Sequence, residues 1–213
     1  MFVPGMSPAG PSLAASLAYI GSASNTADQT TYNFGNFTAP SAGLMIAGVA
    51  ARQSTAGQTR TVSSVSIGGS AATIHVNPSG GNNAAAIASR QVGSGSQAVS
   101  ATFSGGVNRA TCFVWFLTRF HSASPVDVDG INSTTGTSND LSLLILAGGS
   151  AVYVATHSAL NDTLFSSAIE DADIAAEVQF AGARKLSPGG AFPHVETISW
   201  SSGSPGIAAA SWR

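Results

Sequence analysis

RATCFVWFLTRFH, residues 109–121, is the most apolar stretch of the chain, and its interpretation decides the fold. It is too short, and too closely bracketed by Arg109 and Arg119, to cross a membrane as a helix, which takes about 20 apolar residues. In a β-strand, successive side chains point to opposite faces. One face would carry Thr111, Phe113, Trp115 and Leu117, and the other Cys112, Val114, Phe116 and Phe120.

Both faces of this predicted strand are apolar. An ordinary strand of an antiparallel sheet hides one face and exposes the other to water. We therefore predict that the strand lies centrally in its sheet. We also predict that a second layer covers its outer face, made by the protein's own arm, by a loop or by another subunit. Cys112 and His121 cannot form a catalytic dyad on one strand, since they point to opposite faces and lie about 30 Å apart.

The rest of the chain is punctuated by Gly, Ser, Asn or Pro about every 8 to 12 residues, which is typical of an antiparallel sandwich or barrel. In TVSSVSIGG, Val65 and Ile67 alternate with serines. The segment SAIEDADIAAEVQF, residues 167–180, allows a helix that starts with the capping box Ser167-x-x-Glu170. It also alternates as a strand, and we favour a loop through the acidic residues followed by a strand. The sequence predicts an all-β fold, a single antiparallel β-sandwich of jelly-roll type over residues 16–213.

Residues 1–15 are predicted to form an extended N-terminal arm, because prolines at positions 4, 8 and 11 favour extended backbone. Phe2, Val3 and Met6 give the arm apolar anchors. We expect it to dock on the domain or on a neighbouring subunit. The arm lacks the basic start of a signal peptide, so none is expected, and no window is apolar enough for membrane insertion.

Charged residues make up 8% of the 213-residue chain, with a net charge of −2, whereas hydrophobic residues make up 44%. Ordinary soluble domains carry roughly 25% charged residues. A surface of hydroxyls, amides and small side chains is more typical of a subunit in an assembly, or of a displayed β-protein, than of a freely diffusing enzyme. No basic stripe indicates nucleic-acid binding.

Motifs for chemistry are sparse. There is no G-x-S-x-G, no clustered metal ligands and no phosphate loop, so no catalytic residue, cofactor or metal site is predicted and the chain is expected not to be an enzyme. A hydrolase in which His157 or His194 meets an acid and a serine stays an alternative. Two acidic groups leave Ca²⁺ binding open, although neither has the ligand set of an EF-hand. They are Asp127 with Asp129, and Glu170 with Asp171 and Asp173.

Aromatic side chains offer a second alternative, a carbohydrate-binding or receptor-binding adhesin module. Tryptophans and tyrosines could stack on sugar rings of a host-surface glycan if they are exposed, although aromatic residues of β-proteins are more often core. The candidate rings are Trp115, Trp200, Trp212, Tyr19, Tyr32 and Tyr153. The candidate partner-interface residues are Phe2, Val3, Met6, Trp115 and Trp212.

The cumulative pattern resembles small Gly/Ser/Ala-rich β-sandwich proteins from the structural-gene clusters of tailed bacteriophages and prophages. The segments that carry the resemblance are TADQTTYNF, LMIAGVAAR, TVSSVSIGGSAAT, VSATFSGGVNRATCFVWFLT and IAAASWR. It implies a non-enzymatic virion component of tail, fibre or head-decoration type, made in the host cytoplasm. Its partners would be other virion proteins and further copies of itself. The arm lies outside the resemblance.

Overall fold

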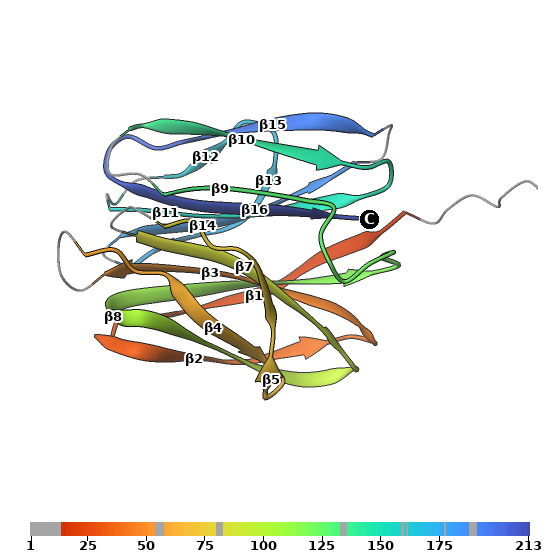
Figure 1. Ribbon diagram of the computed structural model, residues 1–213, viewed down its shortest axis with the longest axis horizontal. Helices are drawn as coiled ribbons and strands as arrows, with labels where there is room; N and C mark the ends of the chain where they lie inside the picture. The colour runs from red at the N-terminus through yellow and green to blue at the C-terminus, as the bar shows by residue number, and fades with distance from the viewer. Residues whose placement is uncertain are drawn as a thin grey trace, which may run out of the picture.

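The fold consists of three stacked antiparallel β-sheets (Figure 1). The computed structural model describes residues 14–53, 58–79, 83–132, 136–158, 160, 162–176, 178–187 and 191–213, and no helix occurs among them. The all-β, antiparallel class is therefore confirmed, whereas the jelly-roll arrangement stays a prediction.

The first sheet, here called the large sheet, contains the N-terminal half of the chain. Its strands are β1 (Ser16–Asn25), β2 (Gln29–Ala39), β3 (Gly43–Gln53), β4 (Val62–Ile67), β5 (Ser70–Ala71), β6 (Thr73–Val76), β7 (Asn83–Val92) and β8 (Gly95–Thr118). Strand β8 organises this sheet, because β2 and β4 pair with its first half and β1 and β3 pair with its second half.

The large sheet curls until it is nearly closed. Its path runs β5-β4-β8-β3-β7-β6, so the consecutive strands β5 and β6 lie at opposite ends of that path. They are separated only by Ala72, whose N–H donates to Val65 on β4. This short bent segment joins the two ends of the sheet, which is thereby nearly closed around a core of its own.

Two smaller sheets cover the large one (Figure 1). The middle sheet runs in the order β13 (Ile169–Ala175), β14 (Gln179–Leu186), β11 (Ser150–His157), β16 (Pro205–Trp212) and β9 (Asp127–Asn132). The outer sheet contains β10 (Ser138–Ile145), β15 (Phe192–Ser199) and β12 (Leu164–Phe165).

Three apolar cores follow from this stacking. The first lies inside the curled large sheet and contains Cys112, Val114 and Phe116. The second lies between the large and middle sheets, where Phe113, Trp115 and Leu117 pack on the middle sheet. The third separates the middle and outer sheets. Side chains on opposite faces of one strand therefore fill two different cores.

The prediction for residues 109–121 is confirmed in its main point. The second half of β8 lies between β1 and β3, and every residue from Thr111 to Leu117 is buried. The layer that covers its outer face is the chain's own middle sheet, whereas the arm, a loop or another subunit had been expected. Phe120 was placed on the wrong face, because β8 ends at Thr118 and Arg119 adopts a φ of 59°, after which Phe120 packs into the second core.

The prediction for residues 167–180 is only partly right. The acidic residues lie in strand β13 rather than in a loop, and the expected strand is interrupted near Ala176, where the chain turns back into β14. Both predicted alternatives, the helix and the loop followed by a strand, took account only of the pattern within residues 167–180. The hairpin forms because β13 completes the edge of the middle sheet by pairing with β14.

The arm can be followed only from its last residues, since residues 1–13 lie outside the described part of the chain. Ala15 donates its N–H to the carbonyl oxygen of Gly148 at 2.8 Å. A Cβ on Gly148 would lie 3.3 Å from the Cα of Ala14, so glycine permits this close approach. The root of the arm is thus fixed against the turn that precedes β11.

Candidate functional site

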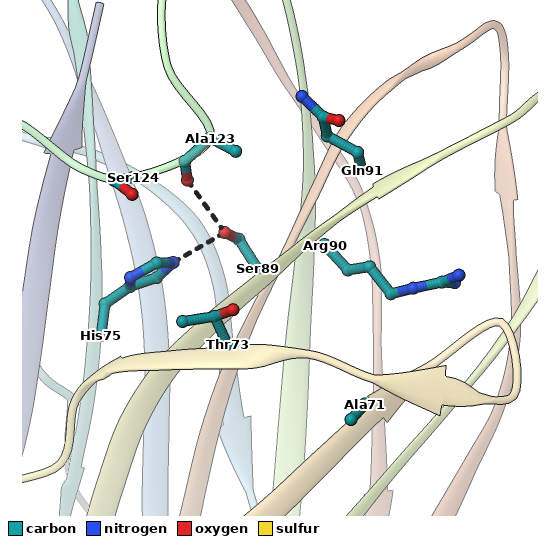
Figure 2. Close-up of a pocket in the computed structure, with 8 residues that line it drawn as sticks. All are labelled: Ala71, Thr73, His75, Ser89, Arg90, Gln91, Ala123 and Ser124. Carbon is teal, nitrogen blue, oxygen red and sulfur yellow. Dashed lines mark hydrogen bonds between the residues drawn. The ribbon is translucent and has the colours of Figure 1, made fainter.

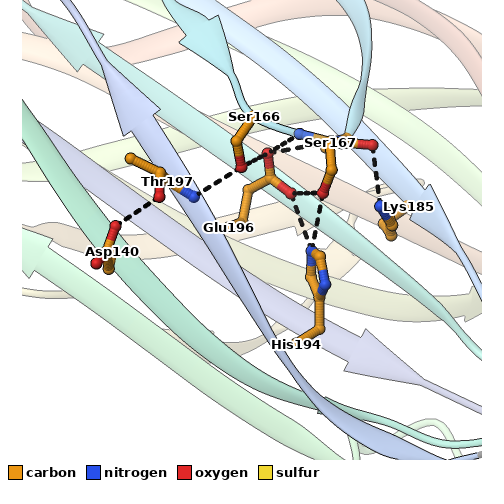
Figure 3. Close-up of polar contacts among 8 residues, drawn as sticks. Asp140, Ser166, Ser167, Lys185, His194, Glu196 and Thr197 are labelled. Carbon is orange, nitrogen blue, oxygen red and sulfur yellow. Dashed lines mark hydrogen bonds and ion pairs between the residues drawn. The ribbon is translucent and has the colours of Figure 1, made fainter.

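The densest polar cluster of the described residues joins β15 to the turn between β12 and β13 (Figure 3). His194 and Glu196 alternate on β15 and therefore share a face. Both carboxylate oxygens of Glu196 accept hydrogen bonds, Oε1 from the N–H groups of Ser167 and Ala168 at 2.7 and 3.1 Å, and Oε2 from the Ser167 hydroxyl at 2.7 Å. Ser166 donates its hydroxyl to Oε1 at 3.1 Å. A carboxylate thus lies in a cradle of protein donors.

His194 completes the cluster. Its Nε2 lies 2.9 Å from Oε2 of Glu196 and 3.3 Å from the Ser167 hydroxyl oxygen. The Glu196 side chain is fully buried, and that of His194 is 11% exposed. Burial opposes ionisation of Glu196, but the hydrogen bonds from Ser167, His194 and Ala168 outweigh it and lower the pKa of Glu196 to about 2.

The residue types match a Ser-His-Glu relay, but their connections do not. In such a relay, one ring nitrogen accepts the serine proton while the other donates to the acid. Here the same nitrogen, Nε2 of His194, must donate to the Glu196 carboxylate and is not free to take a proton from Ser167. The Ser167 hydroxyl donates directly to Glu196 instead. These hydrogen bonds hold the turn at Ser167 against β15 and do not activate a nucleophile.

His194 entered the predictions only as part of the hydrolase alternative, and Glu196 was not among the predicted site residues. The available signal was the His-x-Glu spacing on a predicted strand, which places both side chains on one face. The sequence left Ser167 either at a helix cap or, as we favoured, in a loop, and its partner Glu196 lies 29 residues away on another strand. Only the packing of the outer sheet brings the three residues together.

Four of the acidic residues considered for Ca²⁺ have protein partners, namely Asp127, Asp129, Asp171 and Asp173. Asp127 accepts the N–H of Leu144 at 2.8 Å, and Asp129 accepts the N–H of Ser142 at 2.7 Å. Two carboxylates of the middle sheet thus bind the backbone edge of β10 in the outer sheet. They join two sheets at a corner where main-chain pairing is absent from the described strand pairs.

The second acidic group is divided among several partners. Asp171 accepts the indole N–H of Trp115 at 2.7 Å and forms an ion pair with Arg184, and Gln179 donates to Asp173. Burial raises the pKa of Asp171, although the two donors oppose that shift. Across the described ranges, no three His, Cys, Asp or Glu side chains gather in a way that could hold a metal ion.

A polar cavity of about 260 Å³ opens beside β6 and β7 (Figure 2). His75 and Ser89 form its buried end, where Nε2 of the imidazole lies 2.8 Å from the serine hydroxyl oxygen. That hydroxyl also donates to the carbonyl oxygen of Ala123 at 3.4 Å. Burial lowers the pKa of His75, which favours the neutral ring. The remaining lining residues are Ala71, Thr73, Arg90, Gln91 and Ser124, none of which carries a carboxylate.

The candidate interface residues fall into two groups. Phe2, Val3 and Met6 lie outside the described residues. Trp115 and Trp212 are 0% and 1% exposed, because both rings pack in the second core between the large and middle sheets. Neither ring is at the surface of the chain, so neither is available to a partner.

Exposed hydrophobic side chains gather on the second half of the chain. Within the described ranges, none of the large ones that are exposed belongs to the large sheet. On the outer sheet, Ser142 pairs with Val195 and Leu144 with Pro193, so Leu144 and Val195 are diagonal neighbours on its exposed face. Among the described residues, the exposed large hydrophobic side chains are Val126, Val128, Leu144, Leu160, Leu164, Ile169, Leu186, Phe192 and Val195.

Comparison of the chain with protein-family models, with curated proteins and with solved structures gives no match. The described residues also contain no helix with the length and apolarity needed to cross a membrane.

Proposed function

We propose that this chain is a non-enzymatic structural component of a tailed bacteriophage virion, a tail, fibre or head-decoration protein. It is made in the host cytoplasm and assembles with other virion proteins and with copies of itself, through its N-terminal arm and its sheet faces. The relation to jelly-roll-type sandwiches of phage structural clusters is part of this proposal.

One contrast carries the proposal. The main buried carboxylate, Glu196, binds the protein's own donors, whereas exposed hydrophobic side chains such as Leu144 and Val195 lie on the faces of the stack. Polar side chains that are engaged in hydrogen bonds within the protein are not available for catalysis. Exposed apolar side chains favour contact with other proteins. The charge-poor surface adds to this, because copies with a net charge of −2 repel each other weakly.

The carbohydrate-binding alternative requires exposed aromatic rings, and the candidate rings offer few. Five of the six candidate rings are buried, since Trp115, Trp200 and Trp212 are at most 5% exposed and Tyr32 and Tyr153 are fully buried. Tyr19 is the one candidate ring that is partly exposed, and it packs against the Trp115 ring. Stacking on a sugar requires an aromatic face at the surface, so we expect a glycan array to give no binding by the purified chain.

Purified particles from the host that produces the chain test the main proposal. We expect mass spectrometry to detect the full chain in the particles, and a variant lacking residues 1–15 to be depleted from them while remaining folded by circular dichroism. Particles without the full chain would overturn the virion assignment. Equal incorporation of the truncated variant would remove the arm from it.

A further inference from the structure

The edges of the sheets differ in how their main-chain groups are used. On β9, Asp127 accepts the N–H of Val128 with one carboxylate oxygen. Asp129 accepts the N–H of Gly130 in the same way. The other oxygen of each carboxylate binds an N–H group of β10. A side chain that occupies an edge N–H group leaves no donor for a strand of another molecule, so Asp127 and Asp129 close two facing edges.

Several further strands are protected by their length or composition. Strands β5 and β12 have two residues each, and β6 has four. On β15, Pro193 has no N–H group, and Thr197 donates its N–H to the Ser166 hydroxyl oxygen at 3.0 Å. Short strands, prolines and charges are the usual means by which a sheet edge avoids pairing with another chain. Strand β13 carries three acidic residues, Glu170, Asp171 and Asp173.

Contacts within the chain also occupy the edges of β4, β7 and β2 in the large sheet. Asn77 binds both the N–H and the carbonyl oxygen of Val62 on β4. Near the end of β7, Arg90 donates to a carbonyl oxygen of β4. On β2, register shifts interrupt the pairing with β8 at two places, and Asn33 accepts the N–H of Gly35. Each of these edges is thus interrupted or partly occupied.

Strand β1 is the exception among the described strands. It has ten residues, none of them charged and none of them proline, and it pairs only with β8. Between Ser16 and Asn25, no other described residue forms a hydrogen bond to its main chain. In an antiparallel pair, alternate N–H and C=O groups of a strand point away from its neighbour. One edge of β1, with a single register shift between Tyr19 and Gly21, is therefore available for pairing.

Both faces of β1 carry apolar side chains that are incompletely covered. Ile20 and Ala23 pack against the first core, Tyr19 packs against the second core, and all three are only partly buried. A strand added beside β1 would extend both cores and cover these side chains. The edge thus offers apolar contact together with main-chain hydrogen bonds, the combination by which an added strand joins a sheet.

We propose that β1 pairs antiparallel with β1 of a second copy of this chain, so that the large sheets of two copies join. The partner strand must present an edge that is long, uncharged and without side-chain caps, and β1 is the one described strand with all three properties. A two-fold axis relates two antiparallel copies of one strand, which makes the contact self-complementary. This inference rests on the proposed assembly with copies of itself and names the surface that is used.

Charge confines the contact to the large sheets. Asp171 on β13 accepts the Trp115 indole N–H, so β13 packs over the side of the large sheet where Tyr19 and Trp115 are in contact. The acidic residues of β13 disfavour pairing between the middle sheets of two copies, because like charges on neighbouring strands repel. Strand β1 adds no charge of its own.

A lysine on β1 tests the contact. Ala18 is exposed on this strand, and Ala18→Lys places a charge on the edge. In sedimentation equilibrium, we expect the dissociation constant of the dimer to rise at least about tenfold. Ala98→Lys is the matched control, because Ala98 is equally exposed but lies on β8, between Asn36 of β2 and the N–H of Gly68. This control should dimerise like the wild type, and melting curves show whether both variants are folded.

Hydrogen exchange of the wild-type chain locates the contact without any substitution. The amides of Ser16–Asn25 that point away from β8 should exchange rapidly in dilute solution. They should become slower as the protein concentration is raised through the range of dimerisation. The amides of β2 should show no such dependence on concentration.

Three results would overturn the proposal. The first is a chain that stays monomeric at the highest concentration measured. The second is a dimer that a folded Ala18→Lys variant leaves intact. The third is protection that appears in the outer sheet and not in β1, which would assign the contact to the exposed hydrophobic side chains there. These measurements use the purified chain, so the pairing of β1 can fail while incorporation into virions holds, and the reverse.

Discussion

The two faces of the middle sheet are held in different ways. Towards the large sheet, large aromatic rings enter spaces left by glycines: a Cβ on Gly182 would lie 2.7 Å from the Phe113 ring, and one on Gly48 would lie 2.9 Å from the Trp115 ring. Towards the outer sheet there is also an apolar core, but carboxylates at its margins bind backbone N–H groups. The first contact is set mainly by shape, with one carboxylate, Asp171, accepting the Trp115 indole N–H. The second depends more on carboxylates.

This difference predicts that the two contacts respond differently to substitution and to pH. Apolar packing is insensitive to protonation, whereas a carboxylate that accepts hydrogen bonds loses strength when it is protonated. The outer sheet should therefore loosen before the large sheet as the pH falls.

The largest effect is expected at Trp115. Trp115→Ala removes a fully buried ring and leaves Asp171 without its indole donor, which should lower the free energy of unfolding by about 3–5 kcal/mol. Trp115→Phe is the matched variant, because it keeps most of the volume and loses only the hydrogen bond. Urea denaturation measures both, and equal losses would mean that packing is not the main contribution.

Glu196 is the corresponding test of the outer sheet. Glu196→Ala leaves the N–H groups of Ser167 and Ala168 buried without an acceptor, and we expect a loss of about 3 kcal/mol at pH 7. Hydrogen exchange should rise in β12 and β15 more than in β8. Uniform acceleration across all three sheets would show that the layers unfold as one unit.

The pH dependence follows from the lowered pKa of Glu196. A carboxyl with a folded pKa of about 2 and an ordinary value of 4.5 contributes its full stabilisation above pH 4.5. That contribution is lost as the pH falls towards 2. The stability difference between the wild type and Glu196→Gln should therefore narrow between pH 4.5 and 2, as measured by thermal melting. A constant difference would contradict the hydrogen-bonded carboxylate.

Gly182→Ala tests the shape of the apolar contact. The added methyl group meets the Phe113 ring, and we expect a loss of about 1–3 kcal/mol from overpacking. Gly93→Ala is the control, because a Cβ there meets nothing within 4 Å. Equal melting temperatures for the two variants would mean that the sheets can separate to accommodate the methyl group.

The smallest effect is expected at the corner between β9 and β10. The double variant Asp127→Asn and Asp129→Asn should lower the free energy of unfolding by about 1 kcal/mol. The N–H groups of Ser142 and Leu144 each lose a charged acceptor. The direct measurement is hydrogen exchange at the amides of Ser142 and Leu144, which should become faster. Asp28→Asn, exposed on the large-sheet side, should leave both amides unchanged.

Local sequence was sufficient for the strands whose pattern repeats every two residues. The alternation in residues 61–69 correctly buries Val65 and Ile67, and the two apolar faces of residues 111–117 correctly predict a central, covered strand. These inferences hold because a strand's period depends on backbone geometry, which is the same in every sheet. The predicted face of Phe120 was wrong because Arg119, with its φ of 59°, interrupts the alternation of the strand.

The tertiary structure decided which strands share a sheet and which polar groups meet. Nothing in the local pattern says that β5 and β6 close the large sheet, or that three sheets stack where a single sandwich was expected. The cluster of Ser167, His194 and Glu196 likewise joins segments 27 or more residues apart. The amino-acid pattern alone specifies a chain built of β-strands with few charges. Strand pairing decided where its few carboxylates would be used, because contacts between distant segments are selected by the packing of whole sheets.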